Sequence, residues 1–106
     1  VLERKHPIAV IDSPHAAMTG ETVSVVFAAD HPNAEIRQTY LLVERLNGDE
    51  WSIVADDSSL TTTITWHRDR RLRWTATVTW VAGELGTYRI SYVGRSTATT
   101  PSFTVP

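Results

Sequence analysis

The stretch of residues 56–62, D-D-S-S-L-T-T, carries the residue types best suited to binding chemistry. Hard cations such as Ca²⁺ and Mg²⁺ take carboxylate, hydroxyl and backbone carbonyl oxygens from a bending chain. By spacing alone, however, such a stretch is more often a solvated turn, because Asp and Ser side chains bond to the backbone just after them. The residues therefore leave two interpretations open, a weak cation site and a plain turn.

The remaining polar residues form no recognisable catalytic set. The four histidines, His6, His15, His31 and His67, are scattered and lack the spacing of a zinc-ligand pair. The chain has no G-x-S-x-G nucleophile motif and no phosphate-binding glycine loop. It also has no cysteine, which excludes disulfides and thiolate zinc sites. The sequence predicts that this chain alone is not an enzyme.

Two further features could bind a partner. The four tryptophans, Trp51, Trp66, Trp74 and Trp80, could stack on sugar rings if they were exposed, but they fall on alternating apolar faces that favour the core. The basic run at residues 67–73, H-R-D-R-R-L-R, could contact phosphates or an anionic lipid surface. Because the run is short and interrupted by Asp69, a solvated hairpin loop is the simpler interpretation. The net charge of -2 argues against a general nucleic-acid binder.

These residues are carried by short segments of β type. Asn47-Gly48 sits between two such runs and predicts a hairpin over residues 39–57, because both residues tolerate a positive φ. On its second strand, strict alternation predicts that Trp51, Ile53 and Ala55 share one face. The further segments with β-type composition or alternation are residues 8–11, 22–29, 62–67, 73–81, 87–93 and 102–105.

Short strands separated by turn residues, without helical periodicity, predict an all-β fold. We expect residues 1–106 to form one immunoglobulin-like antiparallel β-sandwich domain of about seven strands. Gly86, Tyr88 and Ile90 form a G-x-Y-x-I sequence, typical of a tyrosine corner, in which the phenol bonds back to nearby backbone. Gly86 and Tyr88 are therefore predicted to be structural residues.

An ordered set of short motifs resembles the C-terminal domain of the neutral (non-lysosomal) ceramidases. It covers nearly the whole chain from Thr22 onward. The set consists of Phe27, H-P-N at 31–33, T-Y-L-L-V-E-R-L at 39–46, W-S-I-V at 51–54, Asp57, Trp66, Trp80, G-T-Y-R-I at 86–90, Gly94 and S-F-T-V at 102–105.

The resemblance implies a function for the chain. In that family a large N-terminal domain holds a catalytic zinc and hydrolyses ceramide to sphingosine and a fatty acid. This chain would be the non-catalytic C-terminal domain that packs on and supports that domain, in a secreted or cell-surface enzyme of sphingolipid metabolism. The first residue, Val1, fits a piece of a larger protein. The alternative is a free-standing carbohydrate-binding or adhesion module, which exposed coplanar tryptophans would favour.

The resemblance also implies a metal ligand set. The family holds a second metal, Mg²⁺ or Ca²⁺, near the interdomain junction through a D-x-D-W-x-T loop, which falls on Asp57, Ser59, Leu60 and Thr62. Asp57 and Thr62 match, whereas Ser59 replaces the second acid and Leu60 the aromatic residue. We therefore expect a weak Mg²⁺ or Ca²⁺ site at Asp57, Ser59 and Thr62, and no cofactor bound tightly by this domain.

Overall fold

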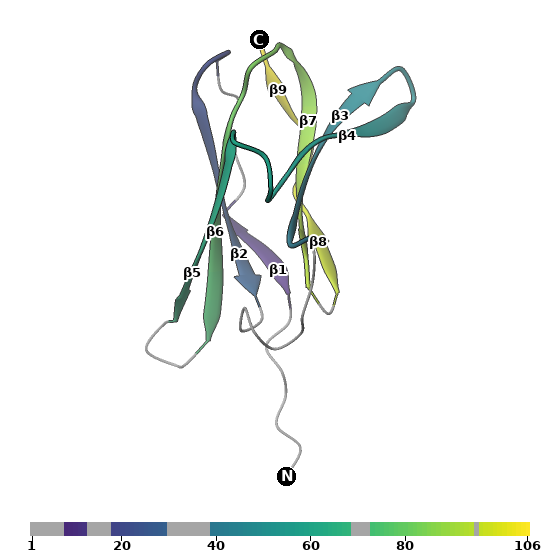
Figure 1. The fold of residues 1–106 in the computed structure, drawn as a ribbon. Coiled ribbons are helices and arrows are strands. Elements are labelled where there is room, and N and C mark those ends of the chain that lie inside the picture. The colour runs from purple at the N-terminus through teal and green to yellow at the C-terminus, as the bar shows by residue number, and fades with distance from the viewer. Residues whose placement is uncertain (1–7, 13–17, 30–38, 69–72, 95) are drawn as a thin grey trace.

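The computed structural model describes residues 8–12, 18–29, 39–68, 73–94 and 96–106. These residues form nine strands in two antiparallel sheets and contain no helix, so none that could cross a membrane. The first sheet has the order β1-β2-β6-β5 and the second β4-β3-β7-β8, with β9 also pairing with β7. Figure 1 shows the two sheets as facing layers. This order is that of an immunoglobulin-like sandwich, as predicted. The strands are β1 Ala9–Asp12, β2 Thr22–Ala29, β3 Leu41–Asn47, β4 Glu50–Asp56, β5 Thr62–Arg68, β6 Trp74–Val81, β7 Gly86–Val93, β8 Thr97–Thr99 and β9 Phe103–Val105.

Strand β8 was missed by sequence reasoning, which predicted no strand between residues 93 and 102. Its three residues are too short to show alternation, and pairing with the far end of β7 defines the strand. Pro101 separates β8 from β9, because proline has no N–H to donate to a ladder. Thr100, just before it, accepts a hydrogen bond from the Ile90 N–H through Oγ1 at 3.1 Å. The last part of the chain therefore pairs twice with β7, first as β8 and then as β9.

The core lies between the sheets and is made by alternate residues of the long central strands. Val25, Phe27 and Val78 of the first sheet face Leu41 and Ile90 of the second, and each has 0% of its surface exposed. Burial of one such side chain stabilises the fold by about 1.5 to 3 kcal/mol. Aromatic rings extend the core toward one end, where Trp80 and Tyr88 lie 4.7 Å apart between ring centroids.

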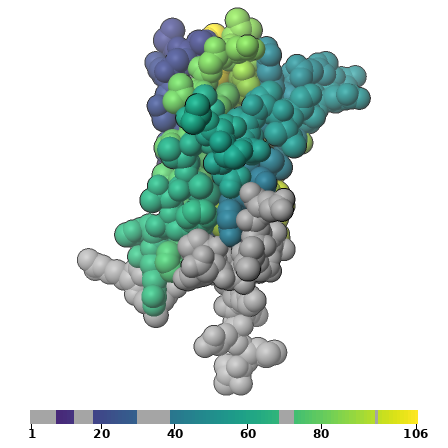
Figure 2. Space-filling model, in the orientation of Figure 1, coloured from purple at the N-terminus to yellow at the C-terminus, as the bar shows by residue number. Residues whose placement is uncertain are grey.

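A β-bulge changes the direction of side chains along β4. Val43 pairs with Ala55 but Glu44 pairs with Ile53, so Val54 is an extra residue on β4. The prediction that Ile53 and Ala55 share a face is wrong for this reason: Ala55 is 6% exposed, in the core, whereas Ile53 is 61% exposed. A bulge of one residue moves all residues beyond it to the other face. The tip of this hairpin extends beyond the sandwich (Figure 2).

Candidate functional site

The best candidate site lies between two neighbouring connections that cross from one sheet to the other. Residues 57–61 join β4 to β5, and residues 82–85 join β6 to β7. The Val81 N–H donates to the carbonyl of Thr61 at 2.9 Å, which ties the first connection to the end of β6, just before the second connection begins. We call residues 56–62 the acidic turn, and we call the second connection together with Gly86, Thr87 and Tyr88 the tyrosine corner.

The acidic turn is closed by its own side chains. The carboxylate of Asp56 accepts hydrogen bonds from the Ser58 hydroxyl and, at 2.9 Å, from the Ser58 N–H. These two bonds favour the charged form and hold the pKa of Asp56 below its ordinary value of 3.8. The Ser59 Oγ accepts from the Asp56 N–H at 3.1 Å. The segment is therefore a hydrogen-bonded turn.

The three residues expected to bind a metal all lie in or beside this turn. Asp57 Oδ1 accepts from the Tyr40 N–H at 3.3 Å. The Thr62 hydroxyl lies 2.6 Å from the carbonyl oxygen of Asp56 and 3.0 Å from that of Ser59, so it bonds within the turn. Ca²⁺ takes about six to eight oxygens. Because much of the turn's oxygen capacity is engaged internally, a complete cation shell needs groups from outside it.

The tyrosine corner depends on a buried phenol. Tyr88 is 2% exposed, and its hydroxyl donates to the carbonyl of Glu84 at 2.8 Å. Burial raises the pKa of Tyr88 above its ordinary value of 10.0, with the Arg45 charge acting in the opposite direction. Gly86 has a φ of 154°, and a Cβ there would lie 2.8 Å from Arg45 Nε. The corner therefore has the geometry of the motif and a backbone position suited to glycine.

Arg45 connects this corner to the neighbouring strand. It pairs with Tyr88 across β3 and β7, and its guanidinium bonds to the Glu84 carboxylate at 3.1 Å and to the Leu85 carbonyl at 2.9 Å. Sequence reasoning missed this role, because it treated Arg45 only as part of the motif at residues 39–46. The contact depends on which residue of β3 lies opposite Tyr88, and local spacing does not contain that register.

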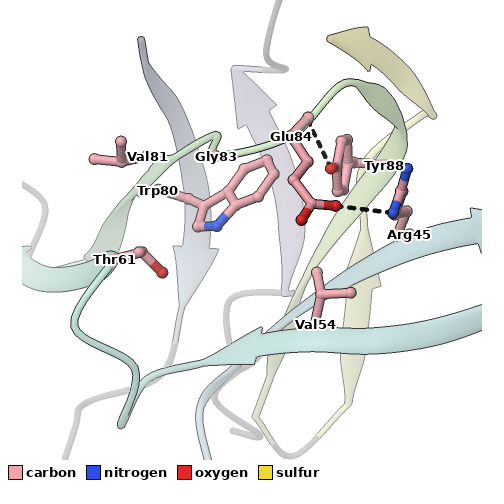
Figure 3. Close-up of a pocket in the computed structure, with 8 residues that line it drawn as sticks. All are labelled: Arg45, Val54, Thr61, Trp80, Val81, Gly83, Glu84 and Tyr88. Atoms are coloured by element: carbon pink, nitrogen blue, oxygen red, sulfur yellow. Dashed lines mark hydrogen bonds and ion pairs between the residues drawn. The ribbon is translucent and has the colours of Figure 1, made fainter. Parts of the chain in front are cut away.

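A pocket of about 270 Å³ opens between the two connections (Figure 3), and we call it the seam pocket. Its apolar wall consists of Val54, Trp80 and Val81, and Arg45 and Glu84 form an ion pair at its polar end. The phenol of Tyr88 donates to backbone and the carboxylate of Glu84 pairs with Arg45, so these groups form no nucleophile–base pair. Among the described residues, no group of three or more His, Cys, Asp or Glu side chains is placed to hold a metal. The chemistry that this pocket offers is apolar contact beside an ion pair.

The tryptophans do not form a platform for sugar rings. Trp80 is 4% exposed. The Arg89 guanidinium lies 4.3 Å from the ring centroid of Trp51 and also bonds to Glu44. Trp66 donates to the Tyr92 hydroxyl at 3.2 Å and lies edge-on to another tyrosine ring. Trp74 is half-buried. The geometry that would favour a carbohydrate-binding module is thus not formed by these four residues.

The remaining candidate residues lie at the periphery. His67 is exposed at the end of β5. His6, His15 and His31 lie outside the described residues, as does most of the basic run, residues 69–72.

Comparison with known proteins gives a consistent result. The family model for the C-terminal part of neutral/alkaline non-lysosomal ceramidase matches residues 6–104. The neutral ceramidase of Mycobacterium tuberculosis is 35% identical over 113 residues, covering 92% of this chain and 18% of that protein. The crystal structure of neutral ceramidase from Pseudomonas aeruginosa superposes with a TM-score of 0.84 at 26% identity, over 92% of this chain and 19% of that one. A structure described as ceramidase complexed with C2 gives a TM-score of 0.85 at 26% identity, over 94% of this chain and 19% of that one. The chain therefore spans less than one fifth of the length of these relatives.

Proposed function

We propose, from the premise that this chain belongs to the neutral/alkaline non-lysosomal ceramidase family as its C-terminal domain, that it packs on and supports the catalytic domain of the same polypeptide. The observation that carries the proposal is the match of the family model to residues 6–104. In this proposal the parent enzyme hydrolyses the amide bond of ceramide to give sphingosine and a fatty acid. The catalytic zinc belongs to the domain outside this chain.

The non-catalytic role is supported by the hydrogen bonds that the polar groups of the two connections make with other groups of this domain. Asp56 and Thr62 bond within the acidic turn, Asp57 accepts from the Tyr40 N–H, and the phenol of Tyr88 donates to the backbone. A general base or nucleophile needs a partner within hydrogen-bond reach that it can activate. These groups instead hold the two connections in place, which suits a supporting domain.

The location of the enzyme outside or on the surface of the cell, and its contact with lipid, are further parts of the proposal. We infer a secreted or cell-surface enzyme of sphingolipid metabolism, as the resemblance implies. The basic run at residues 67–73 is the segment whose charge suits an anionic lipid surface. No nucleic-acid partner is proposed, because the net charge is -2.

A weak Mg²⁺ or Ca²⁺ site at Asp57, Ser59 and Thr62 is also retained as a proposal. Thr62 bonds to the Ser59 carbonyl within the turn, and Asp57, two residues before Ser59, would supply the carboxylate. Other oxygens would come from water or from the catalytic domain, so we expect affinity in the millimolar range or weaker for this chain alone. Titration of Ca²⁺ followed by backbone amide shifts should move residues 56–62 first, and Asp57→Ala should abolish the movement. Unmoved amides in both this chain and the longer enzyme would remove the site.

The supporting role is tested by studying this domain alone and the longer enzyme without it. The 106-residue chain should hydrolyse no ceramide with or without zinc, because it lacks a catalytic set. Deletion of this domain from the longer ceramidase should lower both its thermal midpoint and its turnover. Turnover by the short chain that follows the protein through purification, above a heat-killed control, would overturn the non-catalytic role. An unchanged midpoint and unchanged turnover after deletion would overturn the supporting role.

A further inference from the structure

The tip of the β3–β4 hairpin carries an Asn-Gly sequence on the surface. Asn47 pairs with Glu50 at the end of the ladder. Gly48 and Asp49 form the two-residue loop between them, and all of these residues are exposed. The tip extends beyond the sandwich (Figure 2). Neither the core nor the seam pocket includes Asn47. Solvent and the neighbouring main chain can therefore act on its amide without any opening of the fold.

An asparagine followed by glycine can react with its own backbone. The nitrogen of the following residue attacks the side-chain amide carbon, and a Cβ on that residue hinders the approach, whereas glycine has none. Open space surrounds Gly48: its φ is 64°, and no atom lies within 4 Å of a Cβ added there. The Gly48 N–H belongs to the loop, so it is not committed to the ladder of paired residues. The local structure therefore leaves the attacking nitrogen accessible.

We propose that Asn47 is a site of spontaneous covalent modification, at which the folded protein converts the asparagine to aspartate and isoaspartate. A base in solution removes the Gly48 N–H proton, the nitrogen attacks Cγ of Asn47, and the amide nitrogen leaves as ammonia. The new C–N bond closes a succinimide ring. Water then opens the ring at either of its carbonyl carbons. One opening gives aspartate, and the other gives isoaspartate, in which the backbone runs through the former side chain and is longer by a methylene.

One hydrogen bond slows the reaction. Asn47 Nδ2 donates to Ser52 Oγ at 3.1 Å. Ser52 pairs with Arg45, which precedes Asn47 on β3, so this bond directs the amide back along the hairpin. The side chain must leave Ser52 before its Cγ can meet the Gly48 nitrogen. Because an exposed hydrogen bond contributes little net free energy in water, this contact lowers the rate without preventing the reaction.

The products weaken the tip of the hairpin. A carboxylate at position 47 lies opposite Glu50, and like charges directly opposite each other in a ladder are destabilising. Isoaspartate also lengthens the chain just before the loop, and the register of a hairpin depends on that length. The present register places Trp51 where the Arg89 guanidinium lies 4.3 Å from its ring centroid. We therefore expect modification to loosen the contact between Trp51 and Arg89.

Timed incubation of the longer ceramidase tests the proposal. The folded enzyme is held at neutral and at mildly alkaline pH, and the forms of the peptide that contains residue 47 are separated by chromatography and quantified by mass spectrometry. The same protein unfolded in guanidinium chloride gives the rate of the unhindered chain. We expect the folded enzyme to convert Asn47 within about tenfold of the unfolded rate, a barrier difference of about 1.4 kcal/mol. Conversion should be faster at the higher pH, because the attacking nitrogen must lose its proton.

Three variants identify the groups that react. Asn47→Gln keeps an amide but lengthens the side chain, which disfavours ring closure, and should convert at least about tenfold more slowly. Gly48→Ala adds the Cβ that hinders the attack, in space that the tip leaves open, and should also slow conversion. Ser52→Ala removes the partner of the amide and should speed conversion about two- to fivefold. An unchanged rate for Ser52→Ala would show that this hydrogen bond does not slow the reaction.

Two results would overturn the proposed site. If residue 47 stays unmodified in the folded enzyme while the unfolded sample converts, the fold protects the amide. If Gly48→Ala and Asn47→Gln both convert as fast as the unchanged enzyme, the modified amide lies elsewhere. The effect on the hairpin is measured separately, by amide hydrogen exchange of modified and unmodified enzyme. Exchange in β3 and β4 should become faster after conversion, and unchanged exchange would overturn the loosening of the contact between Trp51 and Arg89.

Discussion

The acidic turn and the tyrosine corner carry the chain between the same two sheets, but different parts of the molecule satisfy their polar groups. In the acidic turn, Asp56 is bonded by Ser58 and Ser59, two and three residues further along the chain. In the tyrosine corner, the buried phenol of Tyr88 and the guanidinium of Arg45, from a different strand, hold the backbone. A connection held by the core is expected to lose more stability on substitution than one held mainly by hydrogen bonds within its own short segment.

The largest effect is expected at Gly86. Gly86→Ala forces a residue with a Cβ into a φ of 154° and pushes it against Arg45 Nε at 2.8 Å. Strain at such a position costs about 1 to 3 kcal/mol, and displacement of the Arg45 hydrogen bonds adds about 1 kcal/mol more. Chemical denaturation should therefore show a markedly lower midpoint.

Gly83→Ala is the matched control for this substitution. Gly83 lies in the same connection, but no atom lies within 4 Å of its added Cβ and its φ is not in the positive region. We expect a change within about 0.5 kcal/mol. Equal losses for the two substitutions would show that the connection as a whole, rather than the Gly86–Arg45 contact, is sensitive.

Tyr88→Phe should have the next largest effect. It removes the hydroxyl that bonds to the Glu84 carbonyl at 2.8 Å and leaves a partly buried acceptor without this donor. The expected cost is about 1 to 3 kcal/mol of unfolding free energy. An unchanged denaturation midpoint would mean that the phenol does not hold the corner, and the contrast between the two connections would fail.

How far the sequence could predict these regions depends on how local their contacts are. Gly86 and Tyr88 could be found because the motif is contained in a few neighbouring residues, and the fold class followed from alternation along single strands. The role of Arg45 could not be predicted, because it depends on the register of β3 against β7. The bulge at Val54 and the short strand β8 were missed for the same reason: each is defined by the partner strand. The seam pocket requires two connections to meet, which no linear pattern records.

Thr62→Val tests the acidic turn. It replaces the buried hydroxyl that bonds to the carbonyls of Asp56 and Ser59 with a methyl group of similar shape. We expect a loss of about 0.5 to 1.5 kcal/mol, less than at the tyrosine corner. Thr62→Ser should restore most of it, and Thr65→Val, on the exposed face of the same strand, should change little. A loss above that of Gly86→Ala would reverse the comparison.

The smallest effect concerns pH and separates the two connections by sign. The pKa of Asp56 is held below its ordinary value of 3.8 by bonds from Ser58, so its contribution to stability is present above about that pH and is lost as the pH falls through the lower folded value. The pKa of Tyr88 is raised above 10.0 by burial. Above that pH the unfolded chain loses the phenol proton before the folded chain does, so the contribution of Tyr88 declines as the pH rises.

Asp56→Asn should therefore flatten the acid limb of a stability–pH curve and leave the alkaline limb unchanged. Tyr88→Phe should flatten the alkaline limb and leave the acid limb unchanged. Denaturation midpoints measured from about pH 3 to 11 would show whether each substitution acts on its own limb, and a variant that altered both limbs equally would show that the two connections are not independent.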